Sequence, residues 1–263
     1  MKLFSTLAVT AFAAVATALN ATEVIDLTAK DLWRNTNAQF TENGISTKRV
    51  LLHSKKPITL DPTKKYTWTM TVGASDNEKP SLVLYGFSPA TENGRTIAAV
   101  NIQTCAGTFT EVIEAAKKGD KTIKVKDASK WTNNASAAVA INAKEDYSDL
   151  PNFKVFISAV ESKVKDGDAW VITFKKPLNM AIPAGTFIRQ HMQGGYLYVS
   201  SRTIPNGKSA TVKHTVTGQA PQGLYNIHKG FMPAMKKAYI VILVDWTNSQ
   251  ATVNIKDAKL TIE

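Results

Sequence analysis

Two tyrosines, Tyr196 and Tyr198, are the side chains in this sequence best suited to ligand chemistry. They stand at positions i and i+2 of a short strand in which Leu197 and Val199 take the parity of the core. Both tyrosines therefore share the opposite face, where their rings would form a flat platform. Sugar rings can stack on such a platform, and the hydroxyl groups offer hydrogen bonds. The alternative is that this face packs against the stretch at 107–191.

Three ionisable residues flank these tyrosines in the sequence, namely Arg189, His191 and Arg202. Arginine suits carboxylate or sulfate ligands because its guanidinium group presents several N–H donors in one plane. The alternative is that all three are solvated turn residues. Trp33 is a further candidate because it stands in a polar, loop-like segment, and loop aromatics often contact ligands. Its alternative role is an anchor at the rim of the core.

Motifs for catalysis are absent from the sequence, so we expect a protein that is not an enzyme. No G-x-S-x-G motif occurs. The histidines do not have the H-E-x-x-H spacing of a metal site; they are His53, His191, His214 and His228. Two alternatives remain open. A pair of carboxylates distant in sequence could meet in the fold, as glycosidases require. A polysaccharide lyase could use Tyr196 or Tyr198 with His191 as acid and base, beside Arg189.

The elements that would position these residues are short strands. Tyr66–Val72 alternates clearly, Ser81–Phe87 is apolar on both faces like a central strand, and Tyr239–Trp246 is strongly apolar. The closing stretch, Val253–Ile262, changes parity midway, which predicts a β-bulge near Lys256 and Asp257. Helical periodicity is nearly absent, with 111–118 as the one short candidate. The pattern predicts an all-β fold.

Residues 107–191 form a self-contained set of strands and turns. Within it, Ile123 and Val125 alternate with Lys124 and Lys126, as expected of a half-buried strand with a charged outer face. We therefore predict a small β domain at 107–191, nested in a jelly-roll β-sandwich. The sandwich is expected to comprise residues 22–106 and 192–263, with the two ends of the nested domain close together.

The first 21 residues have the pattern of a secretory signal peptide, with Lys2 followed by an apolar run and then small residues. Neither that run nor any later one is long enough to cross a bilayer. The expected location is therefore secreted, either extracellular or periplasmic, and not membrane-spanning. The chain has one cysteine, Cys105, which excludes an intrachain disulfide and predicts a buried thiol in a fold that depends on its apolar core.

The formal net charge of +11 favours polyanionic partners such as acidic polysaccharides or anionic surfaces. Most of the cations are lysines scattered along strands and turns, so nucleic acid is not an expected partner. The alternative is that the charge serves only solubility.

Two segments resemble carbohydrate-binding jelly-roll modules of the galactose-binding-like and cellulose-binding types. One is PITLDPTKKYTW at 57–68, and the other comprises KAYIVIL at 237–243 with ATVNIKDAKL at 251–260. The inserted stretch resembles small β modules of bacterial surface and phage-tail proteins, through G-D-x-x-I-x-V-x-D-A-S and P-x-G-T. Lys256 stands where the first acidic residue of the closing motif usually occurs in these modules, whereas Asp257 is kept.

The resemblance implies a secreted, non-catalytic protein that binds polysaccharide or another glycan, with acidic polysaccharide favoured by the charge. Tyr196, Tyr198, Arg189, Arg202 and Trp33 are then the expected ligand contacts. Asp257 is the one candidate for a structural Ca²⁺ site, since hard cations take carboxylate and backbone oxygens; no other cofactor is expected. The alternative is a structural or adhesive component of a cell surface or extracellular layer, in which the inserted stretch mediates self-association.

Overall fold

The computed structural model describes residues 22–34, 36–75, 79–219, 230–245 and 251–263. The expected signal peptide at 1–21 and Trp246, predicted as part of an apolar strand, lie outside these residues. Within the described ranges the chain is almost entirely β-strand. Its helical segments are two 3₁₀ turns, η1 (Lys30–Leu32) and η2 (Ala99–Asn101). No helix among the described residues is long and apolar enough to cross a membrane. The predicted all-β sandwich is confirmed, and 111–118, the one short candidate for a helix, is strand, bridge and turn.

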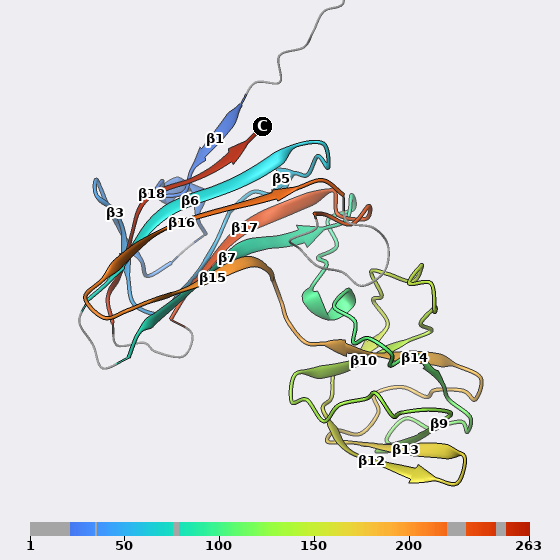
Figure 1. The fold of residues 1–263 in the computed structure, drawn as a ribbon. Coiled ribbons are helices and arrows are strands. Elements are labelled where there is room, and N and C mark those ends of the chain that lie inside the picture. The colour runs from blue at the N-terminus through green and yellow to red at the C-terminus, as the bar shows by residue number, and fades with distance from the viewer. Residues whose placement is uncertain (1–21, 35, 76–78, 220–229, 246–250) are drawn as a thin grey trace, which may run out of the picture.

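Two antiparallel sheets face each other as a sandwich (Figure 1). The six-stranded sheet has the order β16-β6-β18-β3-β2, with β1 also paired to β18. Its strands are β1 (Glu23–Asp26), β2 (Gln39–Thr41), β3 (Gly44–Thr47), β6 (Lys65–Ala74), β16 (Ser209–Thr217) and β18 (Val253–Ile262). The five-stranded sheet has the order β15-β7-β17-β4, with β5 also paired to β17. Its strands are β4 (Val50–His53), β5 (Ile58–Thr59), β7 (Ser81–Ala90), β15 (Leu197–Ile204) and β17 (Lys237–Val244).

Four strand pairs show that the chain of the sandwich forms an antiparallel ribbon that is folded over on itself. β3 pairs with β18, β4 with β17, β6 with β16 and β7 with β15. The early strands of the chain are thus matched to the late ones in reverse order, and the chain alternates between the two sheets. The region at 107–191 is the connection between β7 and β15, where the ribbon turns back on itself.

Period-two alternation builds the core between the sheets. Tyr66, Trp68, Met70 and Val72 of β6 are all completely buried. Large side chains from the facing sheet, such as Phe87, meet them edge-on. Each fully buried apolar side chain of this size contributes about 1.5–3 kcal/mol relative to its exposed state, which is how a chain without a disulfide can hold two sheets together.

A β-bulge in β18 keeps that strand in the core along its whole length, as predicted. The pairing with β6 shifts between Lys256 and Lys259, and Asp257 has a φ of 50°. The shift lets Val253 and Leu260, which differ in sequence parity, both point inward, where each is completely buried.

The inserted region, residues 107–191, contains two further sheets, which lie at one end of the sandwich (Figure 1). One has the order β11-β10-β14-β8 and the other β12-β13-β9. The strands are β8 (Thr110–Glu111), β9 (Thr122–Val125), β10 (Ala137–Ile141), β11 (Val155–Phe156), β12 (Val160–Asp166), β13 (Ala169–Phe174) and β14 (Phe187–Met192). Their buried apolar residues, Val112 to Ile188, form a cluster distinct from the core of the sandwich.

The two ends of the inserted region lie side by side, because Thr104 forms a β-bridge with His191 and the Cys105 amide donates to the Gln190 carbonyl at 2.8 Å. Contact with the sandwich extends beyond these ends. Asn101 of η2 and Asn152 exchange two hydrogen bonds, of 2.8 and 3.0 Å. In addition, Leu150 belongs to the apolar cluster of the sandwich. The inserted region is therefore fixed to the sandwich by the loop that carries the buried Leu150 and Asn152, as well as by its ends.

Candidate functional site: an aromatic face on the five-stranded sheet

The two outer faces of the sandwich differ in chemistry. The outer face of the six-stranded sheet carries threonines and lysines, with Thr67 and Thr215 joined by a 3.0 Å hydrogen bond across the strands. The outer face of the five-stranded sheet carries half-buried aromatic rings and leucines instead. An outer face with so many apolar groups is unusual for a solvated sheet and points to a binding surface. We call its aromatic end the aromatic face, defined by Tyr196, Tyr198, His53, Tyr239 and Arg34.

Strand register brings these side chains to one side. Tyr198 of β15 pairs with Gly86 of β7, Gly86 with Val241 of β17, and Val241 with His53 of β4. Directly paired residues of antiparallel strands point to the same side of a sheet, so these four make one row across it. Val241 faces outward and is nevertheless completely buried.

The rings form a continuous chain of contacts. The centroids of Tyr198 and Tyr196 are 6.1 Å apart, and those of Tyr196 and His53 are 6.2 Å apart. His53 then contacts Tyr239 at 4.9 Å, and the guanidinium carbon of Arg34 lies 4.9 Å from the centre of the Tyr239 ring. Four chain segments, distant in sequence, thus contribute to one surface.

Gly86 makes this arrangement possible. A Cβ at this position would lie 2.1 Å from the Leu197 carbonyl oxygen and 2.7 Å from the Tyr198 Cα, so no side chain fits beneath Tyr198. The register of β15 shifts between Tyr198 and Ser200 at the same place. The close approach and the shift fix where the Tyr198 ring stands.

The carbonyl of Ser54 orients two members of the aromatic face. It accepts a hydrogen bond from Nδ1 of His53 at 3.0 Å and one from Nε of Arg34 at 3.2 Å. Ser54 is itself completely buried and is held by two hydrogen bonds with the backbone of Ile240, at 2.9 and 3.0 Å. Since a carbonyl only accepts, Nδ1 of His53 carries the proton and Nε2 presents a lone pair.

Burial changes the ionisation of two groups on this face, His53 and Tyr198. Burial lowers the pKa of His53 below its usual value, and the nearby charge of Arg34 acts in the same direction. Burial together with the neighbouring Tyr196 raises the pKa of Tyr198 to about 12, so its hydroxyl stays protonated. The face therefore offers ring surfaces, hydroxyl donors, one imidazole acceptor and one cation.

Two of the predicted ligand contacts are wrong because their side chains are buried. Trp33 is 1% exposed, and its indole N–H donates to the Leu27 carbonyl at 3.0 Å, so it anchors the segment that carries Arg34. Arg189 is also 1% exposed and forms an ion pair with Asp149 at 2.9 Å. The adjacent His191 is completely buried, and burial lowers its pKa to about 4. The acid–base group considered for a lyase, which needs His191 and Arg189 beside the tyrosines at the surface, is therefore not assembled.

Arg202 is exposed, but its side chain points to the opposite face of β15 from the two tyrosines. After the register shift it pairs with Val83, and it has the parity of the buried Ile204. It lies close enough to Tyr85 to influence the pKa of that phenol. Arg202 therefore stands at the edge of the sandwich, away from the aromatic face.

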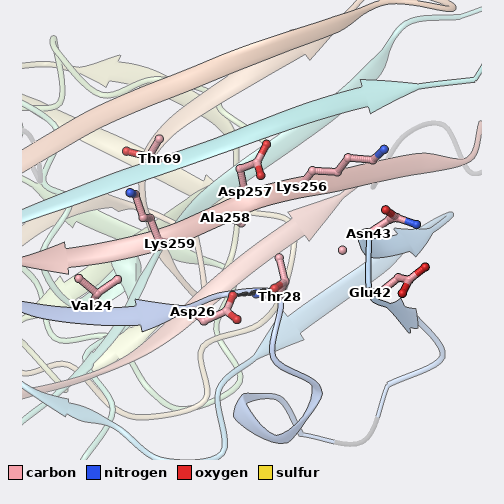
Figure 2. A pocket seen from close by; sticks show the side chains of 11 residues that line it. Val24, Asp26, Thr28, Glu42, Asn43, Thr69, Lys256, Asp257, Ala258 and Lys259 are labelled. Carbon is pink, nitrogen blue, oxygen red and sulfur yellow. Dashed lines mark hydrogen bonds between the residues drawn. The ribbon is translucent and has the colours of Figure 1, made fainter.

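Asp257 lies in a cleft of about 620 Å³ on the six-stranded sheet (Figure 2). Figure 2 shows Asp26, Glu42 and Lys259 around the same cleft. The carboxylate of Asp26 already accepts hydrogen bonds from the amide and hydroxyl of Thr28, at 2.8 and 2.6 Å. Among the described residues, no group of three or more His, Cys, Asp or Glu side chains could hold a metal ion. The described residues around Asp257 therefore do not add to the expectation of a Ca²⁺ site there.

Sequence reasoning found the two tyrosines but missed His53, Tyr239 and Arg34. The parity of β17 contained a signal, because Ala238, Ile240 and Ile242 all take the core face and leave Tyr239 outside. Arg34 had no comparable signal, since only the fold places it over Tyr239.

Comparison with known proteins adds nothing to this surface: no protein-family model, curated protein or solved structure matches the chain.

Proposed function

We propose that this protein is a secreted, non-catalytic, carbohydrate-binding protein that holds glycan chains on the aromatic face. The observation that carries the proposal is the continuous set of rings, from Tyr198 to Tyr239, on an otherwise solvent-facing side of a sheet. Pyranose rings have apolar faces that stack on aromatic rings, and we take the value for aromatic pairs, about 0.5–1.5 kcal/mol beyond area burial, as the scale of each contact. The phenol hydroxyls and the Nε2 lone pair of His53 supply hydrogen-bond partners for sugar hydroxyls.

The strand pairing supports a jelly-roll assignment for the sandwich. In a jelly roll, a long antiparallel ribbon is rolled into two facing sheets. The reversed pairing of β3, β4, β6 and β7 with β18, β17, β16 and β15 agrees with that arrangement. We propose the inserted region as a nested domain, supported by its own apolar cluster. Because one fold supports many functions, the proposal of glycan binding rests on the aromatic face and not on the fold.

Acidic polysaccharide is the favoured ligand class because the net charge is +11. Lys124, which we expected on the charged outer face of its strand, is paired with Glu114 and Asp166 at 3.0 and 3.1 Å. Free cations gather instead at a turn of the inserted region, where Gly119 and Asp120 exchange backbone hydrogen bonds with Leu178. The exposed lysines there are Lys117, Lys118, Lys121, Lys175 and Lys176.

A polysaccharide panel tests the proposal. The variant Tyr196→Ala/Tyr198→Ala should lose at least about tenfold in affinity for the glycan that the wild type retains, because two stacking contacts disappear. Phe187→Ala is the matched control, since it removes an aromatic ring that is 43% exposed on the inserted region. Equal loss in both variants, with circular dichroism unchanged, would show that the aromatic face has no special role.

A structural or adhesive role is the second candidate. The observation in its favour is the row of half-buried leucines, Leu51, Leu84 and Leu243, beside the aromatic face on the same sheet. Contiguous apolar groups of this kind also suit a protein partner. Analytical ultracentrifugation separates the two roles, because self-association through this face should weaken in Leu84→Ser/Leu243→Ser while glycan binding persists.

A further inference from the structure

We propose that the Arg34 end of the aromatic face is a carboxylate subsite, so that the glycan held there contains uronic acid residues. The inference rests on the proposed glycan binding and assigns its ligand class to particular atoms. The anionic group of the ligand would then bind one oriented cation, Arg34, beside the Tyr239 ring, in place of a general attraction to scattered lysines.

Arg34 is exposed, and its guanidinium is held from one side only. The Nε–H donates to the Ser54 carbonyl at 3.2 Å, and the group lies over the Tyr239 ring. No hydrogen bond or ion pair within the described ranges uses Nη1 or Nη2. Four N–H donors thus remain in a fixed plane, which is the geometry that binds a carboxylate through two parallel hydrogen bonds.

Other cations surround Arg34. A depression of about 430 Å³ beside it is lined by Lys30, Lys55 and one carboxylate, Asp31. Within the described part of the chain, neither lysine lies within ion-pair distance of a carboxylate. The local charge is therefore positive, which raises the concentration of an anionic ligand at this end of the face.

His53 and Arg34 both contact the Tyr239 ring, each at 4.9 Å. A sugar bound at this end of the face would therefore meet an imidazole acceptor and a guanidinium donor together. The imidazole can accept from a ring hydroxyl while the guanidinium donates to a carboxylate. Only the guanidinium contact distinguishes a uronic acid from a neutral sugar, in which the carboxylate is replaced by a hydroxymethyl group, since both sugars have ring hydroxyls for the imidazole.

Isothermal titration of a matched pair of ligands tests this inference. The pair is a galacturonate oligomer and its carboxyl-reduced, neutral counterpart. Wild-type protein should bind the acidic form about tenfold more tightly, which corresponds to about 1.4 kcal/mol. Arg34→Met keeps an unbranched side chain and removes the charge, so it should abolish this preference between the two forms. Arg34→Lys should retain only part of the preference, since it keeps the charge and loses the planar fork. Arg202→Met is the control, because Arg202 is exposed at the sandwich edge and should not change either affinity.

Three results would overturn the inference. Equal affinity for both ligands in the wild type, with both lost in Tyr196→Ala/Tyr198→Ala, would refute the carboxylate subsite and leave glycan binding intact. A preference that survives Arg34→Met would assign the carboxylate to another cation. Binding of neither ligand by the folded wild-type protein would contradict uronate binding, and failure across the neutral glycans of the wider panel as well would contradict the proposed function itself.

Discussion

Replacing Arg189 tests how the inserted region is held together. Its guanidinium is completely enclosed and makes four hydrogen bonds. Nη2 donates to both carboxylate oxygens of Asp149 at 3.1 and 2.9 Å, and Nη1 donates to the Lys144 carbonyl at 2.9 Å. Nε donates to Nε2 of His191 at 3.2 Å, and Nδ1 of His191 in turn donates to the Val100 carbonyl at 2.8 Å. The network thus extends from the inserted region to η2 of the sandwich.

The expected loss follows from what Arg189→Met leaves behind. Removing one partner of a buried ion pair costs about 3–5 kcal/mol, because the other charge stays buried without compensation. Asp149 would retain hydrogen bonds from the Lys144 amide at 3.1 Å and the Asn152 side chain at 2.9 Å. These partners place the expected loss at the lower end, about 3 kcal/mol. Arg189→Met/Asp149→Leu should lose less than the sum of the single variants, since neither charge then remains.

Urea unfolding and hydrogen exchange measure this effect. The free energy of unfolding gives the coupling between the two residues, which should be about 1–3 kcal/mol for a contacting buried pair. Amides of β10, which pairs with β14 around Arg189, should lose protection, whereas those of β6 in the sandwich should not. Additive single-variant effects, or a loss below about 1 kcal/mol for Arg189→Met, would refute the account of this network.

Three further predictions concern other parts of the fold. His191 has a folded-state pKa of about 4 against 6.5 when unfolded, so stability should fall by up to about 3 kcal/mol as pH drops from about 6.5 to about 4; urea midpoints that do not shift over this range would contradict its burial as neutral imidazole. Gly86→Ala should displace β15, because the added Cβ would collide with the Tyr198 backbone. The free energy of glycan binding should then fall more than the free energy of unfolding. Crystallographic superposition with the wild type checks the displacement of β15. Replacing residues 107–191 by a short Gly/Ser linker should leave a folded but less stable sandwich, since Leu150 packs in its core; loss of the β-type circular dichroism would contradict it.

Local patterns in the sequence predicted the strands of the sandwich well. Alternation in 66–72 and the parity change in 253–262 each reflect which side of a strand meets the core, and that information is local. The same reasoning placed Tyr196 and Tyr198 on the outer face of the sheet, because Leu197 and Val199 are buried on the inner face.

Residues whose roles depend on distant partners could not be predicted. Arg189 looked like a surface cation because Asp149, which neutralises it, lies 40 residues away. Arg202 changed faces through a register shift that only the pairing with β7 reveals. Arg34 and His53 join the aromatic face through a shared carbonyl, that of Ser54, and through Tyr239 in a strand near the other end of the chain. No spacing rule in the sequence connects these segments.

The central claim is that glycans contact the aromatic face, and a tyrosine-selective NMR titration tests it most directly. Protein with labelled tyrosine rings is titrated with the oligosaccharide that it binds. The account predicts that ring signals of Tyr196, Tyr198 and Tyr239 shift with one common affinity, while those of the buried Tyr66 and Tyr85 stay in place. Saturable binding that leaves all three surface tyrosines unshifted would contradict the claim.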